Sequence, residues 1–256
     1  MVKLTLMPAF LLISFIVIGQ EKSEMKQITG GVFVPLYGSD SSDVVVKDFL
    51  LDVYPITNLE FLDFVKNNSK WQRSHVIKLF ADNNYLIKWE NDTSLGVGMN
   101  PNSPVTTISW FAAKAFCASL EKRLPTMDEW EYVAMASETN PNAQKDSIFN
   151  QRIIEGYETP KTYAKKVGST FENYWGIYDM HGLVWEWTSD FNSVLISGES
   201  RQDVTTEKDL FCGSAAVNAT NLMDYAAFMR YAFRGSIKAN YSIQTLGFRC
   251  AKNVSP

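Results

Sequence analysis

The sequence is most informative from Trp175 to Asp190, which reads Trp-Gly-Ile-Tyr-Asp-Met-His-Gly-Leu-Val-Trp-Glu-Trp-Thr-Ser-Asp. Two tryptophans flank Glu186, so in an extended segment both indoles point to one side and the carboxylate points to the other. A carboxylate in such aromatic surroundings is either buried with hydrogen-bonding partners or binds a cation. The residues alone leave both interpretations open.

The region before this stretch predicts two helices joined by Lys122-Arg123-Leu124-Pro125-Thr126. The first runs from about Trp110 to Lys122, because residues 110, 113, 117 and 120 form one apolar face. Pro125 prevents its continuation, and Thr126 with Glu129 forms a capping box that starts a helix continuing to Ala136. Residues 138–172 are mostly polar and contain turn signals, so we expect them to be mainly loop.

The N-terminal half predicts short strands and one more helix. Gly30-Gly31 leads into a strand at 32–34, and residues 44–54 are also prone to form strands. Thr57 and Glu60 form a capping box for a helix that stops near 67–69. Irregular chain with short strands near 85–89 follows. The pattern predicts one compact α+β domain over residues 27–254, with little regular secondary structure.

The first twenty residues are typical of a signal peptide. Lys3 precedes an apolar run from Leu4 to Ile18, and a polar stretch at 21–27 marks where the mature chain would begin. Pro8 and the short length disfavour a stable membrane span, although an uncleaved anchor is the alternative interpretation. In both cases the folded part is expected outside the cytosol, in a periplasmic or secreted location.

Composition argues against one class of partner, and the cysteine content predicts one disulfide. The chain is 46% hydrophobic and 20% charged, as in an ordinary globular domain, and its net charge of −4 argues against a nucleic-acid partner. It contains three cysteines, Cys117, Cys212 and Cys250. In an oxidising compartment two of the three are expected to pair, but their spacing does not say which two.

Three segments together resemble one protein family. They are residues 104–132, residues 175–190 and the stretch Leu246-Gly247-Phe248-Arg249-Cys250, and in this order they are similar to the sulfatase-modifying-factor family, founded on the formylglycine-generating enzyme. Residues 30–33 and 54–58 match its N-terminal pattern more loosely. The resemblance covers nearly all of the mature chain. It implies a variant of the C-type-lectin fold, and it implies a disulfide between Cys117 and Cys250.

The resemblance also implies a structural calcium ion, held by main-chain carbonyls and one glutamate side chain. The matching positions here are Asp179, Gly182, Val184 and Glu186. Oxygen ligands from a tight loop are what calcium requires. The alternative is a glutamate satisfied by hydrogen bonds without metal. A second calcium site of the family has no matching pattern in residues 138–172.

The family's oxidase chemistry uses a copper(I) ion held by two cysteine thiolates, and this chain departs from that pattern. Counted back from Cys250, the two positions fall at Ala226 and near Asn221, and no cysteine occurs between Gly213 and Arg249. A soft cation needs soft ligands, so the copper site as known cannot form. The other soft or borderline ligands nearby are Met180, His181, Met223 and Met229, which are more typical of core residues.

Four residues are candidates for a groove. Cys212 replaces the first glycine of a Gly-Gly-Ser motif, and Ser214 matches a groove-lining serine of the family. Cys212 is either a reactive thiol or a buried inert one. Arg230 and Arg234 lie four residues apart, so on a helix they would form one positive face. That face either binds a peptide or carboxylate, or pairs with internal acids.

These observations favour an accessory or maturation factor that binds an exported protein or peptide. Some proteins resembling this one are associated with copper-enzyme maturation in denitrifying bacteria, which the resemblance implies as one setting. The first alternative is an oxidoreductase of the formylglycine-generating type that uses other metal ligands. The second is a structural, lectin-like module.

Overall fold

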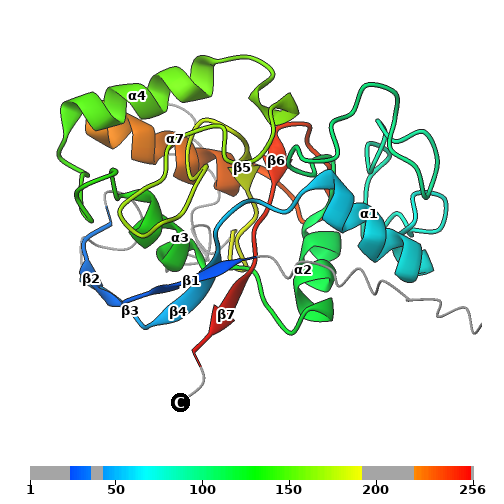
Figure 1. Ribbon diagram of the computed structural model, residues 1–256, viewed down its shortest axis with the longest axis horizontal. Helices are drawn as coiled ribbons and strands as arrows, with labels where there is room; N and C mark the ends of the chain where they lie inside the picture. The colour runs from blue at the N-terminus through cyan, green and yellow to red at the C-terminus, as the bar shows by residue number, and fades with distance from the viewer. Residues whose placement is uncertain (1–23, 36–42, 192–221, 255–256) are drawn as a thin grey trace, which may run out of the picture.

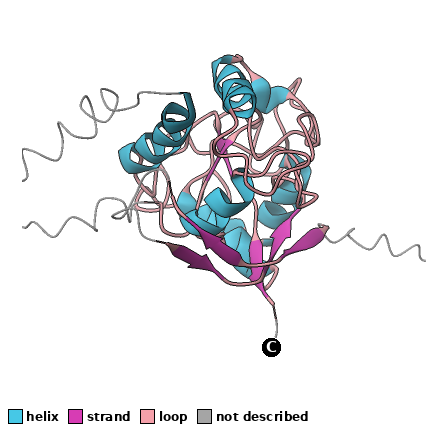
Figure 2. Cartoon of the chain, turned by 90° about the vertical axis from the view of Figure 1, so that its left-hand side faces the viewer, coloured by secondary structure: helices cyan, strands magenta, loops and turns pink. Residues whose placement is uncertain are grey.

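We describe the chain from a computed structural model, which covers residues 24–35, 43–191 and 222–254. Most of the short strands lie together at one side of the molecule, helices lie above and beside them, and one strand pair, Trp185–Glu186 with Leu246–Gly247, lies apart among the helices (Figure 1, Figure 2). Loops make up much of the remainder. This mixed architecture with little regular structure agrees with the α+β class expected from the sequence.

Segments far apart in the sequence form the main sheet. Strand β4 (Phe49–Asp52) lies between β1 (Met25–Ile28) and β7 (Ala251–Asn253), and both pairings are antiparallel. Strands β2 (Gly31–Phe33) and β3 (Val44–Val46) form a separate antiparallel pair. Strand β5 (Trp185–Glu186) pairs in parallel with β6 (Leu246–Gly247), which places the residue 175–190 stretch against the C-terminal segment.

The three helices predicted from capping signals are present. Helix α1 (Asn58–Asn67) begins at Thr57 and helix α3 (Met127–Ala134) begins at Thr126, each with a complete capping box. Helix α2 (Trp110–Ser119) ends three residues before the predicted end at Lys122. Beyond its C-cap the Lys122 amide donates to the Cys117 carbonyl, so the chain turns away there. A 3₁₀ turn, η1 (Ser69–Trp71), follows α1.

Residues 138–172 are mostly loop, as predicted, but the prediction missed a helix. Helix α4 (Ser147–Glu158) occupies the middle of this region, and η2 (Thr162–Ala164) follows it. Asp146 caps α4 by accepting bonds from the amides of Ile148 and Phe149. Phe149 and Ile153 are buried one turn apart. Helix α7 (Leu222–Ser236) packs along the apolar face of α4 (Figure 1).

The strands expected near 85–89 are also not formed. These residues make consecutive turns, and their carbonyl groups are bonded by a side chain instead of a neighbouring strand. Nη1 of Arg73 donates to the carbonyls of Leu86 at 3.2 Å and Trp89 at 2.8 Å. The Tyr85 hydroxyl donates to the Trp71 carbonyl at 3.0 Å. Side-chain bonding therefore replaces sheet pairing in this region.

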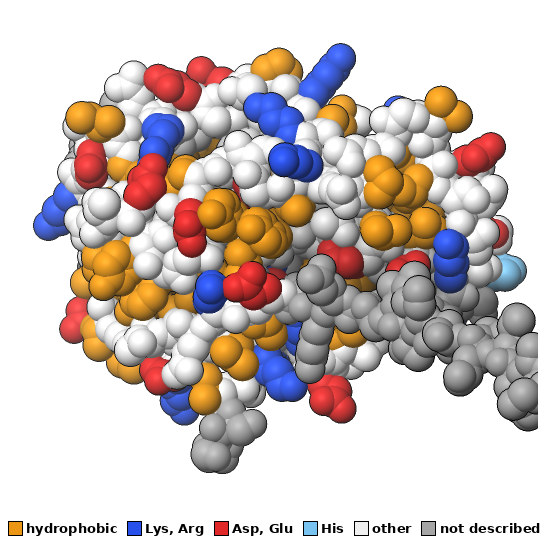
Figure 3. Space-filling model, viewed as in Figure 1, with side chains coloured by type: hydrophobic (Ala, Val, Ile, Leu, Met, Phe, Trp, Pro, Cys, Tyr) orange, Lys and Arg blue, Asp and Glu red, His pale blue; other side chains and the backbone are white. Residues whose placement is uncertain are grey.

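The largest core cluster forms around the disulfide. Cys117 of α2 and Cys250 are bonded, with their Cα atoms 5.6 Å apart, which confirms the pairing implied by the resemblance. The rings of Phe61, Phe116 and Phe248 pack against one another beside this bond. A second cluster lies between the sheet and α3, and a third lies between α4 and α7. Other apolar side chains reach the surface in patches between charged ones (Figure 3).

Candidate functional site

Glu186, the carboxylate between the two tryptophans, is fully buried and bound to Arg249. The Arg249 guanidinium donates from Nε at 2.8 Å and from Nη2 at 2.8 Å, and Trp130 Nε1 donates to the same carboxylate at 2.8 Å. The remaining guanidinium hydrogens go to main-chain carbonyls of residues 52, 53 and 178. A buried charge pair needs this degree of hydrogen bonding to be tolerated.

This arrangement bears on the calcium prediction. Both carboxylate oxygens of Glu186 face the guanidinium of Arg249, so Glu186 as placed does not fit the role of a calcium ligand. Asp179 is buried at a positive φ of 60°, and its carboxylate accepts bonds from the amides of Gly168 and Thr170. Within the described part of the chain, no group of three or more His, Cys, Asp or Glu is placed to hold a metal ion. Calcium binding through the carbonyls of Asp179, Gly182 and Val184 stays a prediction.

Arg230 and Arg234 do share one helical face, but that face is buried. Both lie on α7, and both guanidinium groups bind the buried carboxylate of Glu131 on α3. The distances are 2.8 Å from Arg230 Nη2 and 2.6 Å from Arg234 Nη1. The Arg234 guanidinium also lies 4.6 Å from the centre of the Trp130 ring. Pairing with an internal acid, the alternative to a groove, is therefore what the structure shows for these two arginines.

Burial and charge shift two pKa values in this cluster. Burial alone would raise the pKa of Glu131, but Arg230 and Arg234 overcome that effect and lower it to about 2. Burial, with a contribution from Arg230, lowers the pKa of His181 to about 3. His181 Nε2 lies 2.7 Å from the Ala134 carbonyl and so carries the proton, which leaves Nδ1 to accept from the Tyr157 hydroxyl at 3.4 Å. At neutral pH the histidine is uncharged.

The position where the resemblance places one copper thiolate is filled with apolar groups. Ala226 of α7 is completely buried in a cluster with Ala143, Phe149 and Ile153. Among the other soft ligands considered, Met180 is buried in the core beside the sheet. Cys212, Ser214, Asn221 and the side chain of Met223 lie outside the described residues. The described surroundings of Ala226 provide packing rather than ligands.

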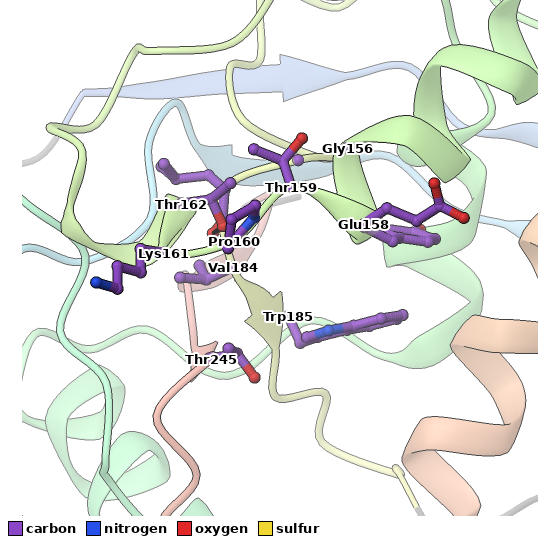
Figure 4. A pocket seen from close by; sticks show the side chains of 12 residues that line it. Gly156, Glu158, Thr159, Pro160, Lys161, Thr162, Val184, Trp185 and Thr245 are labelled. Carbon is purple, nitrogen blue, oxygen red and sulfur yellow. Dashed lines mark hydrogen bonds between the residues drawn. The ribbon is translucent and has the colours of Figure 1, made fainter.

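An open pocket lies where the end of α4 meets the loop that leads into β5 (Figure 4). It has a volume of about 210 Å³. Trp185 lies on one side of it, and the Trp185 ring is stacked between Tyr157 and Phe233 with ring centres 4.6 Å apart on each side. Glu158 and Lys161 are exposed at the rim, and Thr245 closes it from the β6 side. Sequence reasoning missed this pocket because it depends on α4.

Comparison with known proteins shows the family of this chain. A family model described as the sulfatase-modifying factor enzyme 1-like domain matches residues 17–254. The chain belongs to this family. The formylglycine-generating enzyme of Bos taurus is 31% identical over 257 residues, covering 83% of this chain and 68% of the relative. The inactive C-alpha-formylglycine-generating enzyme 2 of Bos taurus is 29% identical over 213 residues, covering 64% and 70% respectively.

Family membership leaves the activity open, since one of these relatives is named as an enzyme and the other as inactive. The serine/threonine-protein kinase Pkn1 of Chlamydia trachomatis is 25% identical over 246 residues, covering 91% of this chain but 38% of the kinase. The crystal structure of CarF has a TM-score of 0.50 at 15% identity, covering 91% of this chain and 99% of CarF. That likeness supports the fold alone.

Proposed function

We propose that this chain is a formylglycine-generating-enzyme-like domain without oxidase chemistry, which binds a protein or peptide outside the cytosol as an accessory or maturation factor. The proposal rests on the number of cysteines and on which of them are bonded to each other. The chain has three cysteines, and Cys117 and Cys250 are bonded to each other in a buried disulfide. Cys212 is left, and one thiolate does not reproduce a two-thiolate copper(I) site.

The packing around the expected site supports the same conclusion. Ala226 contributes to an apolar cluster, and the two nearby arginines are bound to Glu131. Both guanidinium groups are buried and bound to Glu131, so binding a substrate carboxylate with either one would first require breaking a buried ion pair, which is costly. The similarity to a relative named as inactive is consistent with this proposal.

The pocket beside Trp185 is the best candidate for contact with a partner. Its volume of about 210 Å³ is smaller than a usual cofactor or drug-sized site, but it suits one side chain of a protein or peptide. The rim offers one carboxylate, Glu158, and one ammonium group, Lys161, together with threonine hydroxyls. We assign partner binding to this pocket.

The oxidase alternative is tested directly. The chain is expressed with a peptide that contains Cys-x-Pro-x-Arg, and formylglycine is sought by mass spectrometry while copper(I) binding is titrated against a competing chelator. We expect no formylglycine and no stoichiometric copper(I) site. Any weak copper binding should disappear in Cys212→Ser. Turnover of the peptide, or one tightly held copper ion per chain, would overturn the proposal.

The binding role is tested with a matched pair of variants. Thr245→Trp places an indole at the pocket rim, and Val97→Trp adds the same bulk at a fully exposed position outside the pocket. In a pull-down from the exported fraction, we expect Thr245→Trp to lose a partner that the wild type and Val97→Trp retain. Equal recovery by both variants would exclude the pocket. Binding to a glycan array without any protein partner would favour the lectin-like alternative.

A further inference from the structure

The region between α1 and α2 differs from the rest of the chain in charge. Residues 66–88 contain five cations and one acid, Asp82, in a chain whose net charge is −4. The cations are Lys66, Lys70, Arg73, Lys78 and Lys88. None of them takes part in an ion pair within the described residues. Asp63, one turn before Lys66 on α1, and the next two acids, Glu90 and Asp92, reduce the local net charge from +4 to +1, which is still opposite in sign to that of the chain.

The same region exposes a group of apolar side chains. Four consecutive residues, Ile77, Lys78, Leu79 and Phe80, are exposed, and we call them the 77–80 turn. Ile77 is 55% exposed, Leu79 is 70% exposed and Phe80 is 36% exposed. Exposed apolar side chains that gather at one place mark sites of interaction with a protein or a membrane.

The conformation of the 77–80 turn is stabilised by main-chain hydrogen bonds and by packing of the Phe80 ring. The amides of Phe80 and Ala81 donate to the Ile77 carbonyl at 2.9 and 3.3 Å, which closes the turn. The Phe80 ring packs against Phe111, with ring centres 5.1 Å apart, and against Trp71 at 6.1 Å. The turn therefore presents Ile77 and Leu79 outward on a preformed support instead of collapsing onto the core.

The acids of this region offset only part of its positive charge. A hydrogen bond from Ser74, with smaller contributions from His75 and Arg73, lowers the pKa of Asp92. Asp82 accepts bonds from the amides of Asn84 at 3.0 Å and Ser242 at 3.3 Å. Asp92 accepts from Ser74. Arg73 donates to neutral carbonyls, and Lys70 lies 5.8 Å from the centre of the Trp71 ring. The positive charge is therefore available to an anionic surface.

We propose that the 77–80 turn and the lysines of the same chain segment dock this protein onto the surface of an anionic lipid bilayer. The aliphatic tips of Ile77 and Leu79 enter the boundary between headgroups and acyl chains, while the Lys78 ammonium group between them remains among the anionic headgroups. Exposed aliphatic side chains next to lysine charges without ion-pair partners favour an anionic bilayer as the occupant, and the described pocket lies on other segments. This inference does not depend on the binding role proposed for that pocket.

The test uses the full chain and vesicles of phosphatidylcholine, with or without a quarter of phosphatidylglycerol. Hydrogen exchange of residues 76–81 should slow with the anionic vesicles and remain unchanged with the neutral ones. This local measurement is needed because the apolar run at residues 4–18 is present in every variant and can bind lipid by itself.

Two variants and one control complete the experiment. Leu79→Ser changes a residue that is 70% exposed, and Lys78→Glu reverses a charge, so neither change should prevent folding. We expect each to raise about tenfold the concentration of anionic vesicles needed for half-maximal protection of residues 76–81. Ile148→Ser removes a 79% exposed apolar side chain from α4 and should have no effect. Unchanged exchange at 76–81, equal protection of 76–81 by both vesicle types, or protection by an acidic protein instead of lipid would each overturn the proposal.

Discussion

Two buried glutamates of this protein are bound by arginine, and their surroundings differ. Glu186 has one guanidinium partner, Arg249, in the segments by which the sequence resembles its family. Glu131 has two, Arg230 and Arg234, in the layer formed by α3, α4 and α7. The first pair is balanced in charge and holds β5 to the C-terminal segment. The second carries an extra cation beside the place where the oxidase thiolates would be expected.

The comparison shows that the segments that stabilise the fold are distinct from the region in which the family's oxidase site would lie. The segments around Glu186 assemble the disulfide, the aromatic cluster and the sheet, and they do so in a chain that lacks the copper ligands. The α4–α7 layer has its own apolar cluster around Ala226. Family resemblance therefore predicts the first region well and says little about the second.

The largest expected effect is on the disulfide beside the balanced pair. Cys117→Ser with Cys250→Ser removes a cross-link between residues 133 apart in sequence. The free energy of unfolding should fall by about 4–5 kcal/mol, measured by urea denaturation. Reducing the wild type should lower it similarly, and a loss below about 1 kcal/mol would contradict this interpretation.

The next effect compares the two charge clusters directly. Arg249→Ala leaves Glu186 buried without an ionic partner, and we expect a loss of about 3–5 kcal/mol. Arg234→Ala leaves Glu131 still bound to Arg230, so the loss should be about 1–2 kcal/mol. Equal losses in urea titrations would mean that the second arginine of Glu131 does not compensate for the loss of the first.

A smaller effect concerns pH. His181 has its pKa lowered to about 3 from 6.5, so between these values the unfolded chain binds the proton and the folded chain does not. Stability from this group is complete above pH 6.5 and is lost as the pH falls, by about 1 kcal/mol per unit. Glu131, with its pKa lowered to about 2, adds a loss in the same direction below about pH 4.5. Denaturation of wild type and His181→Gln from pH 7 to 5 should give a shallower slope for the variant, and parallel slopes would refute the assignment.

The smallest effect tests why α4 forms. Asp146→Ala removes the side chain that accepts from the amides of Ile148 and Phe149, and it should cost about 1 kcal/mol. Asp146→Asn retains an acceptor and should cost less. If the two variants were equally stable by thermal denaturation, the cap would not contribute, and packing on α7 alone would account for the helix.

The sequence by itself determined the family, the starts of α1 and α3, and the absence of a thiolate pair. Capping signals can be read because their hydrogen bonds join residues three apart, as Thr57 and Glu60 do. Only the tertiary structure decided that Glu186 binds Arg249, 63 residues away, and that Glu131 binds Arg230, 99 residues away. A buried carboxylate requires an oppositely charged partner, but which arginine supplies it is determined by how distant segments pack. Helix α4 had a local signal in the Asp146 cap and the apolar residues at 149, 153 and 157, but the polar turns around it obscured that signal, and the structure was needed to show α7 packed on this face.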